Sequence, residues 1–138
     1  MKRLLFSTRI YAIDVALLIL RVGSSLMMVT HGWPKIANFS EYLNRFADPL
    51  GLGPALSLQG AIFAEFFCAI LVALGLLTRV AVIPLIFTMA VAAFIVHGGD
   101  PFGDKELSLL YLVIYAVLFI TGPGKYSLDK KIGRRSRY

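Results

Sequence analysis

Four long runs of apolar residues, at about 13–33, 54–77, 79–97 and 106–122, dominate the pattern along the chain. Each has about the 17–25 residues that a helix needs to cross the hydrocarbon core of a bilayer. Polar segments that contain glycine and proline separate the runs and indicate turns. The pattern therefore predicts an all-α integral membrane four-helix bundle, in which residues 1–138 form a single membrane domain.

The segment between the first two runs has its own, shorter pattern. Apolar residues recur there at helical spacing on the side opposite a polar set, with Phe39, Tyr42, Leu43 and Phe46 against Glu41, Asn44, Arg45 and Asp48. This arrangement predicts a short amphipathic helix in the first outer loop, resting on the membrane surface or covering the bundle.

Composition agrees with a membrane protein and argues against a soluble domain, a nucleic-acid-binding protein and a dithiol redox protein. The chain is 58% apolar and only 16% charged, with a mean hydropathy of +0.77, which is too apolar for a soluble domain of this size. The net charge of +6 comes mainly from the two terminal segments, where lysine and arginine meet anionic lipid, so we predict contact with the lipid bilayer and no nucleic-acid binding. The single cysteine, Cys68, excludes an intrachain disulfide or a C-x-x-C redox pair.

The distribution of lysine and arginine predicts the orientation. Most of these residues lie on one side of the predicted membrane, at positions 2–9, at Arg79 and in the basic tail 125–138. Only Lys35, Arg45 and Lys105 lie in the loops on the other side. Because basic residues are retained on the cytoplasmic side, both termini are predicted to be cytoplasmic.

Two charged residues lie deep within the predicted spans. Arg21 is in the first span, and Glu65 is the acidic residue nearest the middle of another span. A cation facing lipid at this depth costs about 2.5–3.5 kcal/mol on insertion scales, so Arg21 needs a partner. Both residues lie some 16–18 Å from the expected outer ends of their helices, at 1.5 Å per residue. We therefore predict a buried charge pair between Arg21 and Glu65, with either a structural or a functional role.

A second polar group is expected at the outer mouth of the bundle, where three helix ends meet. His31 and Lys35 end the first span, His97 ends the third and Glu106 begins the fourth. Such a set could hold a polar headgroup or pass a proton, because histidine changes charge near neutral pH. The alternative is that each histidine is an interfacial residue hydrogen-bonded to water or backbone. The ring of an amphipathic ligand would then lie among apolar residues of the same region, namely Met28, Trp33, Phe63 and Tyr111.

Metal and haem are disfavoured at this mouth. Two histidines and a carboxylate can bind a metal ion, but His31, His97 and Glu106 lack the close spacing of most ligand sets. Haem held by two histidines needs facing imidazoles with a wide apolar slot between them. We therefore predict no metal site.

Several motifs in a fixed order resemble the DoxX family of small bacterial membrane proteins. They are RVGSSLMMVTHGWPK at 21–35, AEFF at 64–67, LGLLTR at 74–79, His97, ELSLLYL at 106–112 and GPGKYSLD at 122–129. The resemblance implies a multi-pass protein of the bacterial cytoplasmic (inner) membrane. The family positions that it implies are Arg21, His31, Gly32, Lys35, Glu65, Arg79, His97, Glu106 and Asp129. The family takes its name from a subunit of a thiosulfate:quinone oxidoreductase, so the resemblance also implies a quinone-linked redox role.

Three functional hypotheses follow. The first is a subunit or accessory of a membrane redox system that binds a quinone-like or other amphipathic small molecule within the bundle. If the protein is enzymatic, this hypothesis makes it a quinone-linked oxidoreductase subunit. The second is a non-catalytic membrane scaffold that recruits a redox or stress-response partner through its basic tail and outer helix. The third is a small-solute or lipid transporter. A redox-protein partner and a homo-oligomer are compatible with these hypotheses, and the identity of the ligand stays open.

Overall fold

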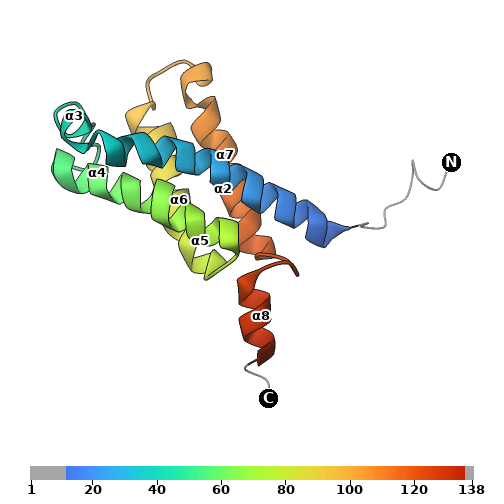
Figure 1. Ribbon diagram of the computed structural model, residues 1–138. Helices are drawn as coiled ribbons and strands as arrows, with labels where there is room; N and C mark the ends of the chain where they lie inside the picture. Colours follow the sequence, from blue (N-terminus) through green and yellow to red (C-terminus); the bar gives the residue numbers. More distant parts are fainter. Residues whose placement is uncertain (1–11, 136–138) are drawn as a thin grey trace.

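The computed structural model describes residues 12–135, and every regular element within this range is a helix (Figure 1). The all-α prediction is therefore confirmed for the described residues. Lys2, Arg3, Arg9 and Arg137, which entered the orientation argument, lie outside them. The elements in chain order are α2 (Ile13–Ala37), α3 (Phe39–Leu43), α4 (Pro54–Ile62), η1 (Phe63–Cys68), α5 (Ala69–Leu74), α6 (Thr78–Val91), η2 (Ala92–Val96), α7 (Phe102–Thr121) and α8 (Leu128–Arg135).

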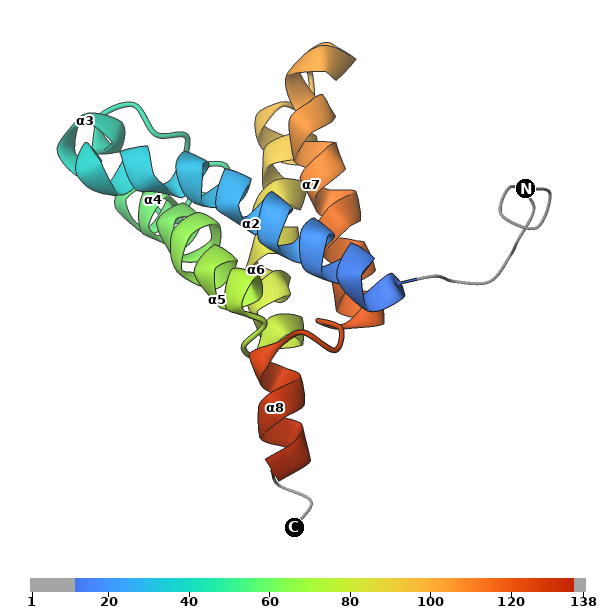
Figure 2. The same cartoon turned by 45° about the vertical axis from the view of Figure 1, so that its right-hand side comes forward.

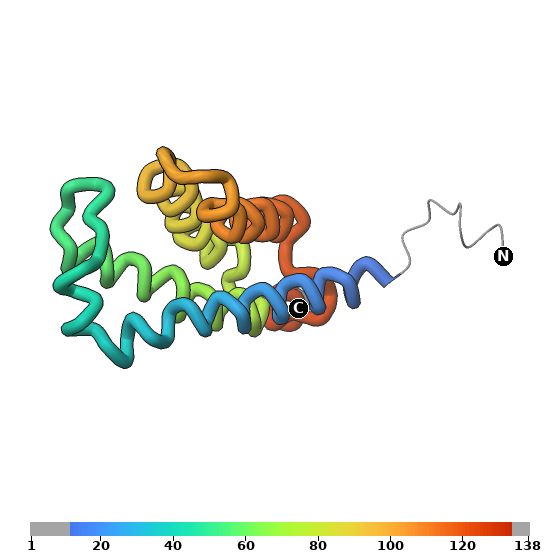
Figure 3. Tube along the Cα trace, turned by 90° about the horizontal axis from the view of Figure 1, so that it is seen from above, coloured from blue at the N-terminus to red at the C-terminus, as the bar shows by residue number. Residues whose placement is uncertain are grey.

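The long helices form two packed pairs. Helix α2 lies against the continuous helix α4–η1–α5, and α6–η2 lies against α7. The pairs meet where α5 leads into α6 and diverge toward the end that carries α3 (Figure 2). Seen from above, the two pairs form separate layers that are joined near the α5–α6 turn (Figure 3).

Among the described residues, three helical segments are long and apolar enough to cross a membrane, namely Ile13–Ala37, Pro54–Leu74 and Thr78–Val96. Helix α7 has 20 residues, but its first two turns carry Asp104, Lys105 and Glu106. Membrane-spanning helices are thus confirmed, whereas a fourth crossing stays a prediction. The expected short helix in the first loop is present as α3, and Arg45, just beyond its end, forms an exposed ion pair with Glu41 at 2.9 Å.

The first apolar run was expected to end near residue 33, but α2 continues through Pro34 to Ala37. Proline removes only one amide donor from a helix, and the contacts beyond it compensate. Lys35, one residue later, pairs with Glu65 of η1. Gly32 lies so close to η1 that a Cβ atom there would be 2.9 Å from the Glu65 carbonyl carbon. Gly32, just before the proline, and Lys35, just after it, therefore both hold α2 against η1.

Candidate functional site

A cavity of about 670 Å³ occupies the space between α4–η1 and α6–η2, next to the loop that follows α3. Its wall is mainly apolar, with large side chains from both helical pairs and from the loop, including Leu52, Leu56, Phe63, Ile83, Phe87 and Val96. Both π-helical segments, η1 and η2, contribute residues to this wall. Such π-helical turns are frequent at functional sites, because the wider turn redirects the side chains that follow it.

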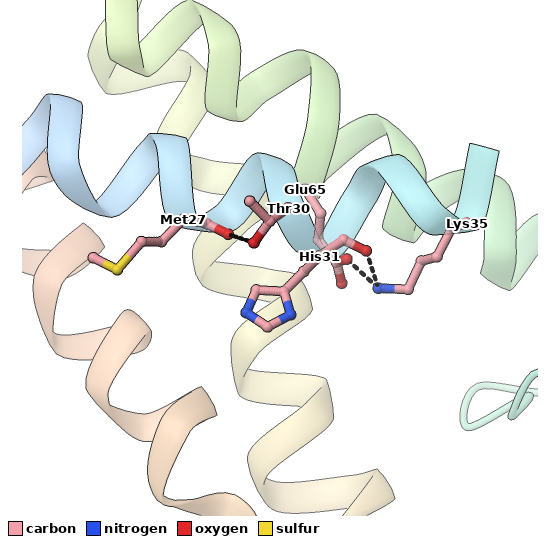
Figure 4. Close-up of polar contacts among 5 residues, drawn as sticks. All are labelled: Met27, Thr30, His31, Lys35 and Glu65. Carbon is pink, nitrogen blue, oxygen red and sulfur yellow. Dashed lines mark hydrogen bonds and ion pairs between the residues drawn. The ribbon is translucent and has the colours of Figure 1, made fainter. Parts of the chain in front are cut away.

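An ion pair between Lys35 and Glu65 forms the polar part of the cavity wall. The Lys35 Nζ atom donates to Glu65 Oε2 and, at 3.3 Å, to the backbone carbonyl of His31. The Lys35 and Glu65 side chains are only 15% and 8% exposed. Figure 4 shows that the carbonyl of His31, and not its imidazole, takes part in these contacts. The Lys35 ammonium group and the Glu65 carboxylate thus neutralise each other at the edge of the apolar cavity.

His97 also lines this cavity, at the point where η2 ends. Its Nδ1 atom lies 2.8 Å from Asp100 Oδ2, so the loop carboxylate fixes the orientation of the ring. Lys105 donates to the Gly98 carbonyl at 2.9 Å and connects the same loop to α7. The cavity therefore contains three ionisable side chains: Lys35, Glu65 and His97.

The loop beside the cavity is organised by one carboxylate. Asp48 accepts hydrogen bonds from the amides of Leu52 and Gly53, at 3.0 and 2.9 Å, and from the Ser57 hydroxyl at 2.9 Å. Desolvation raises the pKa of Asp48, but the bonds from Gly53, Ser57 and Leu52 together outweigh it and lower that pKa below its ordinary value. Pro49, Leu50 and Leu52 of this loop line the cavity, so Asp48 holds part of its cover.

The other predicted site residues lie outside the cavity lining. The His31 ring contacts Tyr111 edge-on, with a centroid distance of 6.0 Å, and Glu106 is exposed. Trp33 is 56% exposed and lies against Phe66, while Met28 and Tyr111 are buried in the core. The structure thus places Lys35, Glu65, His97 and Phe63 at one cavity, and the remaining predicted residues around it.

The predicted pair between Arg21 and Glu65 is wrong, because each charge has a different partner. The Arg21 guanidinium donates to the carbonyls of Val72 at 2.8 Å, Ala73 at 2.6 Å and Tyr126 at 2.8 Å. The first two carbonyls belong to the last turn of α5, which carries the negative end of the helix dipole. Burial of Arg21, which is only 1% exposed, is therefore stabilised by backbone carbonyls.

The predicted pair assumed that the outer ends of the two spans, near Trp33 and Pro54, lie at the same level of the membrane, and they do not. Gly32 packs directly on the Glu65 backbone, so Pro54 extends about three turns beyond Trp33. At the other end of α2, a Cβ atom on Gly75 would lie 2.6 Å from Arg21 Nη1. Position 75 therefore requires glycine for two reasons: a side chain there would collide with Arg21, and the φ of 68° favours glycine.

Asp129 is a structural residue whose role the sequence did not indicate. Its carboxylate accepts hydrogen bonds from the amides of Leu77 at 2.7 Å and Thr78 at 2.9 Å, at the start of α6. Its own amide donates to the Gly75 carbonyl at 2.8 Å. The motif around residue 129 was visible, but the sequence did not show that this segment folds back onto the α5–α6 turn.

Within residues 12–135, no group of three or more His, Cys, Asp or Glu side chains is arranged to hold a metal ion.

The model of the DoxX family matches residues 16–98, more than half of the chain. The chain belongs to the DoxX family. It is similar to two inner membrane proteins of Escherichia coli (strain K12): YqjF, 28% identical over 126 residues, and YphA, 32% identical over 131 residues. The first alignment covers 88% of this chain and 95% of YqjF, and the second covers 85% and 90%.

An uncharacterized membrane protein of Mycobacterium tuberculosis, Rv3486, is 32% identical over 124 residues, or 70% of this chain and 75% of Rv3486. No solved structure matches the chain. The spanning helices and these DoxX relatives agree that this is a multi-pass protein of the inner membrane, as predicted. The three ionisable cavity residues lie within or at the edge of the matched range, since the match ends at residue 98.

Proposed function

We propose that this DoxX-family protein binds a quinone-like or other amphipathic small molecule in the cavity between α4–η1 and α6–η2. The observation that carries the proposal is an apolar cavity of about 670 Å³ with an ion pair in its wall. Sites for small molecules commonly combine a mainly apolar lining with a few polar groups that orient the ligand. The role fits a subunit or accessory of a membrane redox system.

The exposed part of the lining indicates how a ligand reaches the cavity. Leu56, Phe63, Ile83 and Phe87 line it, yet each is more than half exposed in the isolated protein. In the membrane these apolar side chains face the hydrocarbon core, because they lie on spanning helices. A ligand dissolved in the bilayer could therefore enter sideways between α4 and α6.

The ion pair favours a ligand head that carries no net charge. The charges of Lys35 and Glu65 cancel, and an additional charge in this apolar space would lack a partner. Lys35 can donate to a ligand carbonyl, and the Glu65 carboxylate can accept from a ligand hydroxyl. A quinone presents carbonyl acceptors and its quinol presents hydroxyl donors, so both forms suit the pair.

Binding of a short-chain ubiquinone to the protein in lipid nanodiscs tests this proposal. The double variant Lys35→Met/Glu65→Met replaces the pair with apolar side chains and leaves no buried charge unpaired. We expect it to remain folded and to bind at least about tenfold more weakly, because charge-assisted hydrogen bonds contribute about 1.5–3 kcal/mol each. The control is Glu106→Gln, an exposed residue outside the lining, which should bind as the wild type does. Unchanged binding by the folded double variant would exclude the cavity as the site.

We further propose that α7 is a fourth span and that both termini are cytoplasmic. Helix α7 has 20 residues and packs along α6, and a helix of that length extends about 30 Å. A periplasm-specific reporter enzyme fused after Tyr138 should therefore be inactive, while a cytoplasmic reporter at the same position should be active. The opposite pattern would refute this topology.

A further inference from the structure

The loop between α7 and α8 lies at the end of the bundle away from α3 (Figure 1). A second cleft, of about 700 Å³, is lined by residues of this loop. The start of α2, the end of α7, the loop after α7 and the first turn of α8 surround it. Residues from all four segments line it, including Asp14, Thr121, Gly124, Lys125, Lys130 and Lys131. The proposed ligand cavity shares none of these residues.

The cleft carries a net positive charge. Within residues 12–135, none of the ammonium groups of Lys125, Lys130 and Lys131 has a carboxylate partner. The two carboxylates of the lining are already occupied by backbone amides. Asp14 accepts from the amide of Lys125 at 2.8 Å, and Asp129 accepts from the start of α6.

The loop that lines the cleft also has free backbone donors. In the described part of the chain, the amides of Gly124, Tyr126 and Ser127 donate to no protein acceptor. Gly122 and Gly124, at φ of 78° and 77°, give the loop a backbone shape that other residues rarely adopt. Loops with free amides beside basic side chains are typical of anion-binding sites.

The position of the cleft indicates where such an anion comes from. Asp14 lies in the first turn of α2 and Thr121 ends α7, so the cleft lies at the level where the long helices leave the hydrocarbon. Tyr126, half exposed in the same lining, has the amphipathic ring that is enriched at membrane interfaces. The lysines therefore meet the headgroup layer, where anionic lipids present their phosphates.

We infer that this cleft binds the phosphate group of an anionic phospholipid. The ammonium groups of Lys125, Lys130 and Lys131 supply the attraction, and the free amides of Gly124, Tyr126 and Ser127 supply directed hydrogen bonds. Phosphate dissolved in water has the same chemistry, so the experiment must distinguish the two sources.

Native mass spectrometry of the full-length protein can count bound lipids after extraction in the presence of phosphatidylglycerol or phosphatidylcholine. We expect phosphatidylglycerol to be retained in preference to phosphatidylcholine. In the variant Lys125→Gln/Lys131→Gln this retention should fall roughly 25-fold, since each lysine near an anionic surface contributes about fivefold. The matched control, Arg45→Gln/Lys105→Gln, removes the same charge at the other end of the protein and should retain the lipid.

Competition with inorganic phosphate separates the two sources. If millimolar phosphate leaves the bound phosphatidylglycerol in place, the ligand is the lipid headgroup. If phosphate displaces it, the site binds the anion itself, and free phosphate is the source. Equal retention by the cleft variant and the control would overturn the proposal. A single symmetric peak for each variant on size-exclusion chromatography shows that lost binding does not reflect unfolding. If the double variant does not fold, Lys131→Gln alone replaces it, with an expected fall in lipid retention of roughly fivefold.

Discussion

Replacing Arg21 with methionine should destabilise the protein, because two carbonyls lose the one donor they have. Within residues 12–135, the carbonyls of Ala73 and Tyr126 accept hydrogen bonds from Arg21 alone, whereas that of Val72 also accepts from the Gly75 amide. An unsatisfied buried acceptor costs about 1–3 kcal/mol, which gives a range of about 2–6 kcal/mol for two, and the lower end applies here because both bonds are only part-buried.

Methionine offsets part of this loss, because it removes a cation that burial disfavours. We therefore expect the lower end of the range, about 2 kcal/mol, and a fall in the melting temperature on the order of 5–10 °C. Thermal unfolding in detergent, followed by circular dichroism at the helical band, measures the change.

The matched control is Arg45→Met. Arg45 pairs with Glu41 at 2.9 Å, but both side chains are more than 60% exposed. Exposed pairs contribute little, so this variant should melt within about 0.5 kcal/mol of the wild type. If Arg21→Met melts at the same temperature as Arg45→Met, the carbonyl contacts do not support the fold and the reasoning is wrong.

Two other predictions concern the cavity and its cover. Gly32→Ala should lower the free energy of unfolding by about 1–3 kcal/mol and weaken ligand binding, because the new Cβ would lie 2.9 Å from the η1 backbone. The control is Gly23→Ala, whose Cβ would have nothing within 4 Å, and this variant should be neutral or stabilising in thermal unfolding. The loop held by Asp48 should open in acid. The pKa of Asp48 in the folded protein lies below its ordinary value of 3.8, so the ionised carboxylate stabilises the loop fully above pH 3.8, and this stabilisation is lost as the pH falls through the lowered pKa. Hydrogen exchange of residues 48–53 between pH 6 and 3 measures this opening, and an equal response in Asp48→Asn would contradict it.

Features that depend on local pattern could be predicted from the sequence. The apolar runs gave the long helices, and the spacing of Phe39, Tyr42 and Leu43 gave α3. Lys35, Glu65 and His97 were singled out because ionisable residues near or within an apolar span are unusual. The structure places all three at one cavity.

Features that depend on the tertiary arrangement could not be predicted. The partners of Arg21 are backbone carbonyls, which every residue carries and which leave no signal in the sequence. The histidine set at the mouth assumed nearly parallel helices that end together. Because the two helical pairs diverge, His97 reaches the cavity while His31 faces Tyr111.

The contact between Arg21 and the Tyr126 carbonyl has a consequence for biosynthesis. These two residues are separated by 105 positions, so the ribosome completes the first span long before the last acceptor exists. At about 5–20 residues per second, Arg21 waits roughly 5–20 s for that acceptor. Chains that stop before residue 126 leave the first helix with an incompletely satisfied cation in the membrane. Translation past residue 126 is thus a condition for the complete acceptor set of Arg21, and a chain truncated before that point lacks one of the three carbonyls.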